Sequence, residues 1–325
     1  MVSQLTVAPG STRAEQPKGA KPGSKGSQSA RIRSPRGFIW FCMGPVIIFL
    51  LVIALAPTVL ALVDSLRELS LTVFTKRGQF IGLENYRQLL GNDALFYATI
   101  WRTAIFVGVV VPIEFVLGLS IALYISREFR GRRLLVTLLM LPTMVAPVVV
   151  GMIWRYLLMP SFGLLTHYLG RLGLFVEAPV FSDPATAFAA LMIIDVWEWT
   201  PFMMLIMLAG LSTLPEEPVE AASLDGASSW QVLWHVKLPL LRPLIVLALL
   251  VRAIDASKVF ETIYVLTGGG PGDATEVITT FAYRTTFLKW DLGYGAAICL
   301  VLAFVSLVVA GLFYKVASRS ERGPP

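Results

Sequence analysis

Long apolar blocks alternate with short polar segments along most of this chain. The first block, 38–63, runs for 26 residues without a charge. A helix of roughly 20 residues crosses a hydrocarbon core of about 30 Å, and helices satisfy their own backbone in lipid. The pattern therefore predicts an all-α, polytopic membrane protein with six transmembrane helices, at about 38–63, 99–125, 134–158, 185–211, 243–266 and 293–315.

Composition supports this class, since hydrophobic residues make up 56% of the chain and charged residues only 15%. A soluble domain of 325 residues carries more charge than this. Segment 1–37 is different, being rich in Gly, Ser, Pro, Gln and basic residues, and is expected to be a disordered tail. We expect a membrane domain over 38–317 and a second short tail over 318–325. The first block is too long for the core of a cleaved signal peptide, which has about 7–15 residues.

The distribution of Lys and Arg predicts the orientation. If the N-terminus is inside, the inner segments carry 16 of these residues and the outer segments carry 7. Cytoplasmic loops hold the excess of positive charge in membrane proteins. The chain is therefore expected in the cell (inner) membrane with both termini cytoplasmic. The strongest single signal is the run Arg127, Arg130, Arg132 and Arg133.

The longest inner loop, 212–242, has the pattern of two short helices. Thr213 is a candidate cap for the first helix, and Asp225-Gly226 is a candidate end. Ser228 or Ser229 is expected to cap the second helix, and Leu238-Pro239 to stop it. From the residues alone, an interfacial linker and a plain helical hairpin remain open alternatives.

The same loop resembles a known motif. Glu220-Ala221-Ala222, then Gly226, then Leu238-Pro239 match the EAA loop of permease subunits of ABC importers. The resemblance covers about 38–317 and favours the carbohydrate branch of that family, of the maltose and glycerol-3-phosphate type. The further residues that carry it are Asn85-Tyr86, Asp225-Gly226-Ala227, Trp197, Thr200-Pro201-Phe202, the run from Pro239 to Pro243 and the run from Tyr264 to Pro271.

The resemblance implies a type I ABC importer permease fold and an ATP-driven, binding-protein-dependent sugar importer. It implies a second homologous permease, a cytoplasmic ATPase dimer and an extracytoplasmic solute-binding protein as partners. Loop 213–240 would couple to the ATPase. The coupling residues it implies are Glu220, Ala221, Ala222, Asp225, Gly226, Leu238 and Pro239.

Charged residues inside the predicted spans are candidates for function, because charges at bilayer depth are costly unless they are paired or hydrated. Spacing by three residues in the fifth span allows neighbours to pair along Arg252, Asp255, Lys258 and Glu261. Glu114 in the second span is a further candidate, equally compatible with a structural role. Carboxylates and Arg can bind sugar hydroxyls, and aromatic rings can stack on sugar rings. Adding the positions implied by the resemblance, the predicted substrate path contains Asp195, Glu198, Trp199, Phe202, Arg252, Asp255, Ala256 and Val259.

Other classes are less consistent with the sequence. The Gly-rich segment 267–272 lacks the Lys and Ser/Thr that a phosphate-binding loop needs, so we expect no ATP hydrolysis by the chain itself. His167 and His235 are expected on opposite sides of the membrane, which disfavours an enzyme or a metal site, and no cofactor or nucleic acid is expected. An ion-coupled secondary transporter leaves the 212–242 loop unexplained. Glycerol-3-phosphate or another polyol remains an alternative substrate.

Overall fold

The computed structural model describes residues 36–70, 78–173 and 179–321. The chain divides into two units, up to Ala54 and from Leu55 onward. The predicted tail over 1–37 lies almost entirely outside the described residues. Over the described part of the chain, four helices are long and apolar enough to cross a membrane. They correspond to the first, second, fourth and sixth apolar blocks and are α1 (Arg36–Ser65), α3 (Ala94–Ile125), α7 (Pro184–Ser212) and α13 (Leu292–Glu321).

The third and fifth apolar blocks are divided, where one helix was expected for each. The third forms α4 (Arg132–Met140), a short 3-10 turn η2 (Pro142–Met144) and α5 (Pro147–Leu157). The fifth forms α10 (Leu238–Ala256) and α11 (Glu261–Leu266). Prolines explain the first division, because a proline lacks the N–H that a continuing helix would use. Pro201, by contrast, lies inside α7 without ending it.

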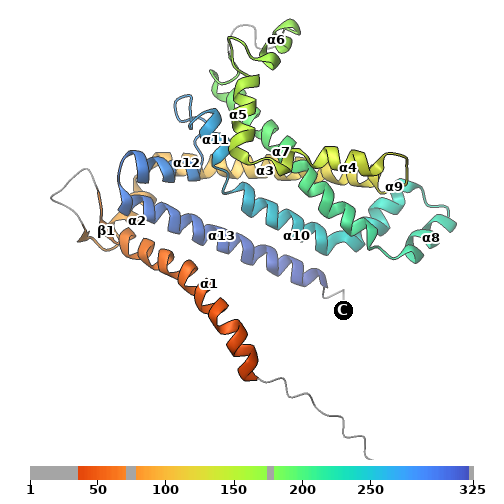
Figure 1. The fold of residues 1–325 in the computed structure, drawn as a ribbon, viewed down its shortest axis with the longest axis horizontal. Helices are drawn as coiled ribbons and strands as arrows, with labels where there is room; N and C mark the ends of the chain where they lie inside the picture. Colours follow the sequence, from red (N-terminus) through yellow and green to blue (C-terminus); the bar gives the residue numbers. More distant parts are fainter. Residues whose placement is uncertain (1–35, 71–77, 174–178, 322–325) are drawn as a thin grey trace, which may run out of the picture. The chain divides into compact units, whose positions relative to one another are not determined.

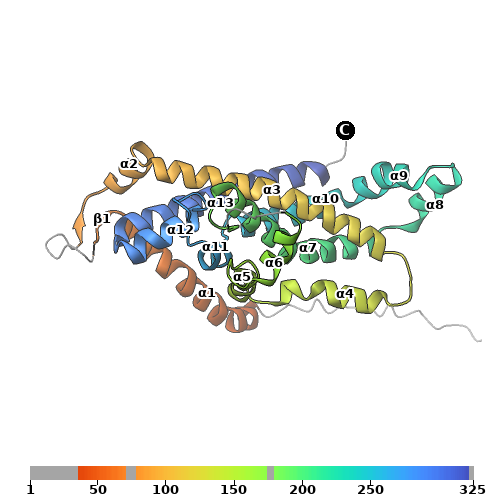
Figure 2. The same ribbon diagram turned by 90° about the horizontal axis from the view of Figure 1, so that it is seen from above.

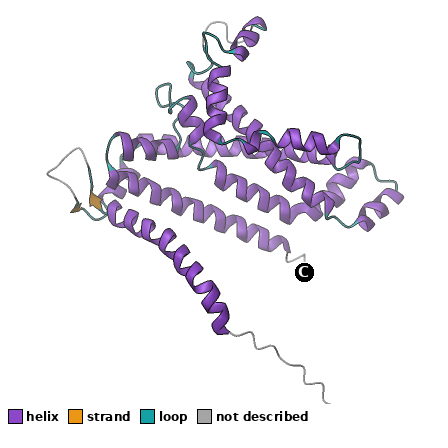
Figure 3. Ribbon diagram, in the orientation of Figure 1, coloured by secondary structure: helices purple, strands orange, loops and turns teal. Residues whose placement is uncertain are grey.

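Helices α3, α7, α10 and α13 run side by side in the second unit, whereas α5 and α6 (Leu164–Arg171) turn away from that direction (Figure 1). Almost all regular structure is helical (Figure 3), as predicted. The exception is a two-stranded hairpin of β1 (Arg67–Glu68) and β2 (Gln79–Phe80). The remaining elements are α2 (Glu84–Gly91), α8 (Glu216–Leu224), α9 (Ser229–Val232), η3 (Leu233–Lys237), α12 (Ile278–Tyr283) and η4 (Arg284–Leu288).

Small residues allow the central helices to approach closely. A Cβ built on Gly118 of α3 would lie 2.8 Å from the backbone nitrogen of Met204 in α7. On the other side of α7, a Cβ on Gly210 would lie 2.2 Å from a methyl carbon of Leu244 in α10. Small residues at such contacts are typical of membrane helices, whose association depends on van der Waals packing. Helix α7 is therefore held between α3 and α10.

One end of the bundle is closed by α2. Asn85 is buried and donates through Nδ2 to the carbonyl oxygens of Ser65, at 2.8 Å, and Arg67, at 3.1 Å. The hydroxyls of Tyr86 and Ser65 lie 2.7 Å apart. These bonds satisfy backbone groups where α1 ends, as a buried helix terminus requires. Asn85 and Tyr86 thus lie in the first turn of α2, directly after the turn that leads into it. The other end of the bundle carries α8, α9 and the turn between α3 and α4 (Figure 2).

Cys42 and Cys299 are free and exposed. One expectation about a small feature is wrong. Thr213 does not cap α8; its hydroxyl donates to the carbonyl of Gly210 at 2.9 Å and closes the end of α7. Pro215 occupies the N-cap position of α8 instead. A hydroxyl between two helices can form a hydrogen bond with the backbone of either helix, and the hydroxyl of Thr213 bonds to the preceding one.

Candidate functional site: a buried ion cluster and an exposed helical loop

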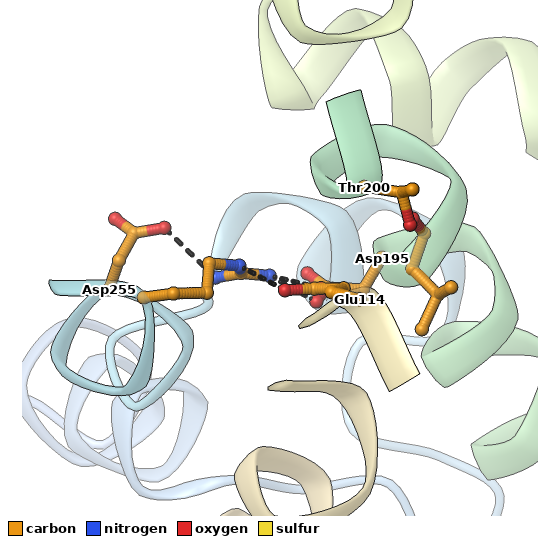
Figure 4. A network of polar contacts seen from close by, with 6 residues as sticks. Glu114, Asp195, Thr200 and Asp255 are labelled. Atoms are coloured by element: carbon orange, nitrogen blue, oxygen red, sulfur yellow. Dashed lines mark hydrogen bonds and ion pairs between the residues drawn. The ribbon is translucent and has the colours of Figure 1, made fainter. Parts of the chain in front are cut away.

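Arg252 is the centre of a buried ion cluster that joins three helices (Figure 4). Its Nε donates to Oε2 of Glu114 at 2.7 Å, and its Nη2 donates to Oε1 of Glu114 at 2.9 Å. Nη2 also donates to Asp195, and Nη1 donates to Oδ2 of Asp255 at 3.0 Å. Glu114 comes from α3, Asp195 from α7, and Arg252 with Asp255 from α10. The planar guanidinium suits this role because it presents several donors in fixed directions.

Burial makes this cluster energetically important. The side chains of Arg252, Glu114 and Asp195 are 1%, 0% and 3% exposed, whereas that of Asp255 is 53% exposed. A charge in such surroundings is very costly unless it is paired and hydrogen-bonded. Trp199 adds a contact, with its ring centroid 4.9 Å from Cζ of Arg252. One cation thus faces three carboxylates, and only Asp255 extends the cluster to an exposed surface.

Glu198 lies one helical turn beyond Asp195 on α7 and is 1% exposed. Its Oε2 has no hydrogen-bond partner among the described residues. Buried polar atoms almost always have a partner, so an unpartnered one needs an explanation such as a ligand or water. Among the residues of the predicted path, Glu198 is the one with a buried side-chain oxygen that has no hydrogen-bond partner among the described residues.

The other predicted path residues are spread around this cluster. The rings of Trp199 and Phe202 meet edge to face at 6.1 Å. Ala256 is fully buried in the apolar core. Val259 lies in the break after α10, where its carbonyl accepts from the hydroxyl of Thr279. The structure therefore groups the charged and aromatic members near α7 and α10, and leaves Ala256 within the packing.

The predicted charge ladder on the fifth block extends only one step. Arg252 and Asp255 pair, as their spacing indicates. Helix α10 then ends at Ala256, so Lys258 and Glu261 do not continue on its surface. In the described part of the chain, no ion pair involves either of these two residues. Arg252 also pairs with Glu114, which is 138 residues away in the sequence. The sequence alone offers no reason to connect these two residues.

The 212–242 loop forms the expected helical pair. Helix α8 ends at Leu224, and Gly226 follows with φ of +81°. Ser228 caps α9 in a capping box with Gln231, whose backbone N–H donates to the serine hydroxyl at 3.4 Å. Leu238-Pro239 does not stop the second helix, contrary to prediction. The chain passes through the π-helical turn η3 directly into α10, whose first turn accommodates a proline because its N–H is not needed there.

Most of the coupling residues implied by the resemblance are exposed. Glu220, Ala221, Asp225, Gly226 and Pro239 are exposed, and Ala222 and Leu238 are half-buried. Apolar side chains are exposed beside them: Leu224 is 88%, Trp230 66% and Trp234 53% exposed. The two indole rings pack against each other at 5.6 Å. Exposed apolar groups gathered at one place on a small polar-rimmed unit indicate a contact surface.

A second ion cluster lies in the segment before and within α12–η4. Arg284 contacts Asp273 at 2.6 Å and Glu276 at 2.5 Å. Burial raises the pKa of Glu276 to about 7, and Arg284 opposes the rise. A hydrogen bond from Arg284 lowers the pKa of Asp273. Thr275 donates to the carbonyl of Gly270 at 2.7 Å, which fixes the Gly-rich turn. The Gly-rich segment 267–272 forms a turn, and the ion cluster beside it was not foreseen.

Comparisons with known proteins agree with this geometry. The chain is 39% identical over 251 residues to the trehalose/maltose transport system permease protein MalF of Thermococcus litoralis, covering 77% of this chain and 83% of that protein. It is 37% identical to the trehalose transport system permease protein SugA of Mycobacterium tuberculosis, covering 75% and 77%.

The fold is also that of solved permeases. A bacterial ABC transporter involved in the import of the acidic polysaccharide alginate has a chain that superposes with a TM-score of 0.76 at 22% identity, covering 87% of this chain and 96% of that one. The family model for the inner membrane component of binding-protein-dependent transport systems matches residues 114–322, which include the ion cluster and the loop. The chain therefore belongs to the family of binding-protein-dependent transport system inner membrane components: it is a multi-pass membrane permease subunit with the type I ABC importer fold, and not an enzyme.

Proposed function

We propose that this chain is the permease subunit of an ATP-driven sugar importer. It forms a translocation path with a second permease, receives sugar from an extracytoplasmic binding protein, and is driven by a cytoplasmic ATPase dimer. The relatives named for trehalose and maltose transport support a disaccharide as the substrate class. The excess of Lys and Arg in the corresponding segments supports a cytoplasmic position of both termini.

The observation that carries the proposal is the connection between the loop and the ion cluster. The helical pair α8–α9 joins the end of α7 to the start of α10. Those two helices supply Asp195 and Arg252, which contact each other deeper in the bundle. A displacement of the loop would therefore move α7 and α10, which are joined by the ion pair between Asp195 and Arg252. Such a rigid-body movement is the kind of change by which packed elements transmit a signal.

The ATPase would contact the exposed face of the loop. Leu224, Trp230 and Trp234 offer apolar contact area there, and Glu220 and Asp225 offer charges at its rim. Aromatic residues are the commonest sources of binding energy at protein interfaces. Gly226 enables the tight turn between α8 and α9, because its φ of +81° suits glycine.

The sugar path would pass Asp255, the exposed member of the ion cluster, and Glu198, which is buried within this chain. Asp255 and Glu198 have the acceptor groups that sugar hydroxyls need, and Trp199 and Phe202 offer ring faces. Ala256 and Val259 would shape the path without polar contacts. Four of the five N–H groups of Arg252 donate to carboxylates, so we assign it the role of positioning Asp255 rather than of binding sugar.

The same charge pattern bears on the alternative substrate. A phosphate ester such as glycerol-3-phosphate would meet an excess of carboxylates, and the cation at this site is already paired. We therefore favour a neutral sugar. Excess unlabelled trehalose should compete with labelled substrate in a transport assay, and glycerol-3-phosphate should not.

The central test is transport in proteoliposomes that contain the complete importer. Replacing the catalytic glutamate of the partner ATPase should abolish sugar uptake at saturating ATP, with the complex still assembled. Uptake that persists with this ATPase would falsify the proposal. Uptake that requires ATP but collapses with a protonophore would favour the ion-coupled alternative, in which the buried acids carry protons.

A further inference from the structure

An apolar hollow lies between α3, α4 and α7. Its volume is about 670 Å³. Its lining is almost wholly apolar, and its one hydroxyl, on Thr200, donates to the carbonyl of Val196 at 2.6 Å. Apart from the indole N–H of Trp197, a sugar would find no free hydrogen-bonding group among these side chains. The occupant that suits the hollow is therefore a hydrocarbon chain.

A basic cluster lies at the start of α4, on the same polypeptide segment as the hollow. Arg130, Arg132 and Arg133 gather around the turn at Gly131. Within the residues that the structure describes, no ion pair joins these arginines to a carboxylate. Glu128 is the single acid in the turn. These guanidinium groups are thus available to an external anion, and arginine binds phosphate with two parallel hydrogen bonds.

The spacing between these two features matches one leaflet of a bilayer. Helix α4 begins at Arg132, and the hollow is lined from Leu138 to Val145. At 1.5 Å per residue, Leu138 and Leu139 lie about 9 to 11 Å along α4 from Arg132, close to the end of that helix at Met140. Half of a hydrocarbon core is about 15 Å thick. A lipid whose headgroup meets the arginines would place an acyl chain in the hollow.

Helix α3 gives the same depth independently. Its lining residues Leu117 and Ile121 precede its end at Ile125 by eight and four residues, or about 12 and 6 Å. The turn between α3 and α4 lies at the same end of the bundle as α8 and α9 (Figure 2). The anionic leaflet and the ATPase would therefore both be at that end.

We propose that the arginine turn and the hollow together form a binding site for one anionic phospholipid of the cytoplasmic leaflet. The arginines bind the headgroup phosphate, and the cleft between α3, α4 and α7 holds an acyl chain. This inference depends on the membrane orientation but not on the transported substrate. A lipid in this cleft would also support α4 against α7 next to the break at Pro142.

The test uses the complete importer purified in detergent and stripped of lipid. The complex is incubated with equal amounts of phosphatidylglycerol and phosphatidylcholine and repurified, and bound lipid is counted by mass spectrometry. Wild type should retain phosphatidylglycerol in about tenfold excess. Arg130→Gln/Arg132→Gln/Arg133→Gln should lose that excess. The matched control, Arg87→Gln/Arg171→Gln/Lys289→Gln, removes three charges elsewhere and should keep it.

A second pair of variants tests the hollow itself without changing charge. Val196→Phe fills the hollow and should reduce bound phosphatidylglycerol about as strongly as the triple arginine variant. Leu134→Phe enlarges an exposed side chain on α4 outside the hollow and should leave retention unchanged. Retention in Val196→Phe equal to wild type would overturn the proposal, and is the result expected if the second permease fills the hollow. Equal retention of both lipids by wild type would overturn it as well.

Discussion

The ion cluster and the α8–α9 loop both depend on acidic residues, in opposite surroundings. In the cluster, Glu114 and Asp195 are buried and share one arginine. In the loop, Glu216 and Glu220 are exposed. A buried charge that loses its partner is strongly destabilising, whereas an exposed one contributes little to stability. The cluster should therefore govern whether the subunit folds, and the loop should govern what it binds.

Removing the cation should have the largest effect. Arg252→Met leaves Glu114 and Asp195 buried without a counter-ion and should destabilise the subunit by about 3–5 kcal/mol. We expect aggregation or a large loss of protein in fluorescence-detected gel filtration. The neutralised control is Arg252→Met/Glu114→Gln/Asp195→Asn, which should recover much of the yield because no charge of these three residues is left buried. A monodisperse single variant with unchanged thermal stability would contradict the assigned role of the cluster.

The loop should show the reverse behaviour. Trp230→Ala removes an exposed side chain, so insertion and thermal stability should be unchanged. Loss of a central interface aromatic costs about 2 kcal/mol, or roughly thirtyfold in ATPase affinity. The measurement is co-purification of the ATPase under increasing salt. Full retention of the ATPase by this variant would contradict the proposed role of the loop in ATPase binding.

Gly226→Val tests the loop through its backbone. Valine at a positive φ is strained by about 1–2 kcal/mol, and a Cβ at Gly226 would meet nothing within 4 Å, so no clash is added. ATPase binding should weaken about tenfold. Gly82→Val is the matched control, because Gly82 also has a positive φ and open space and lies outside the loop. If both variants bind the ATPase equally, the turn has no special role.

A substitution at Glu198, next to the ion cluster, should impair sugar uptake without lowering the stability of the subunit. Glu198→Gln keeps the shape of a side chain whose Oε2 lacks a partner, so the thermal stability should not fall. Loss of a charged hydrogen bond to substrate should raise the KM for sugar uptake about tenfold. Uptake with an unchanged KM would remove Glu198 from the path, and a loss of stability would assign it to the packing instead.

The smallest expected effect concerns pH and the second ion cluster, formed by Arg284, Asp273 and Glu276. Because burial raises the pKa of Glu276 to about 7, the folded state holds a proton that the unfolded state has lost at intermediate pH. Stability contributed by this group is present below about pH 4.5 and is lost as the pH rises towards 7. Glu276→Gln should reduce the fall in Tm between pH 5 and 8 by a few degrees. An identical pH dependence in wild type and variant would show that this group does not titrate.

The sequence determined the membrane class, the positions of the apolar blocks and the family. These features depend on local patterns: block length, the spacing of Glu220, Ala221 and Gly226, and the capping residue Ser228. Helix ends were also predictable where a short-range signal exists. The breaks near Pro142 and Pro147 have a local cause in the sequence, although one helix was expected over 134–158.

Only the tertiary structure decided how the charges pair. From spacing alone, Arg252 had neighbours on its own helix, and the three-residue pattern favoured a ladder that continued to Glu261. The helix instead ends at Ala256, and the arginine is held by Glu114 and Asp195 from two other helices. Pairing across 138 and 57 residues depends on which helix faces meet. That is set by the close contacts at Gly118 and Gly210, which no local pattern of charges reveals.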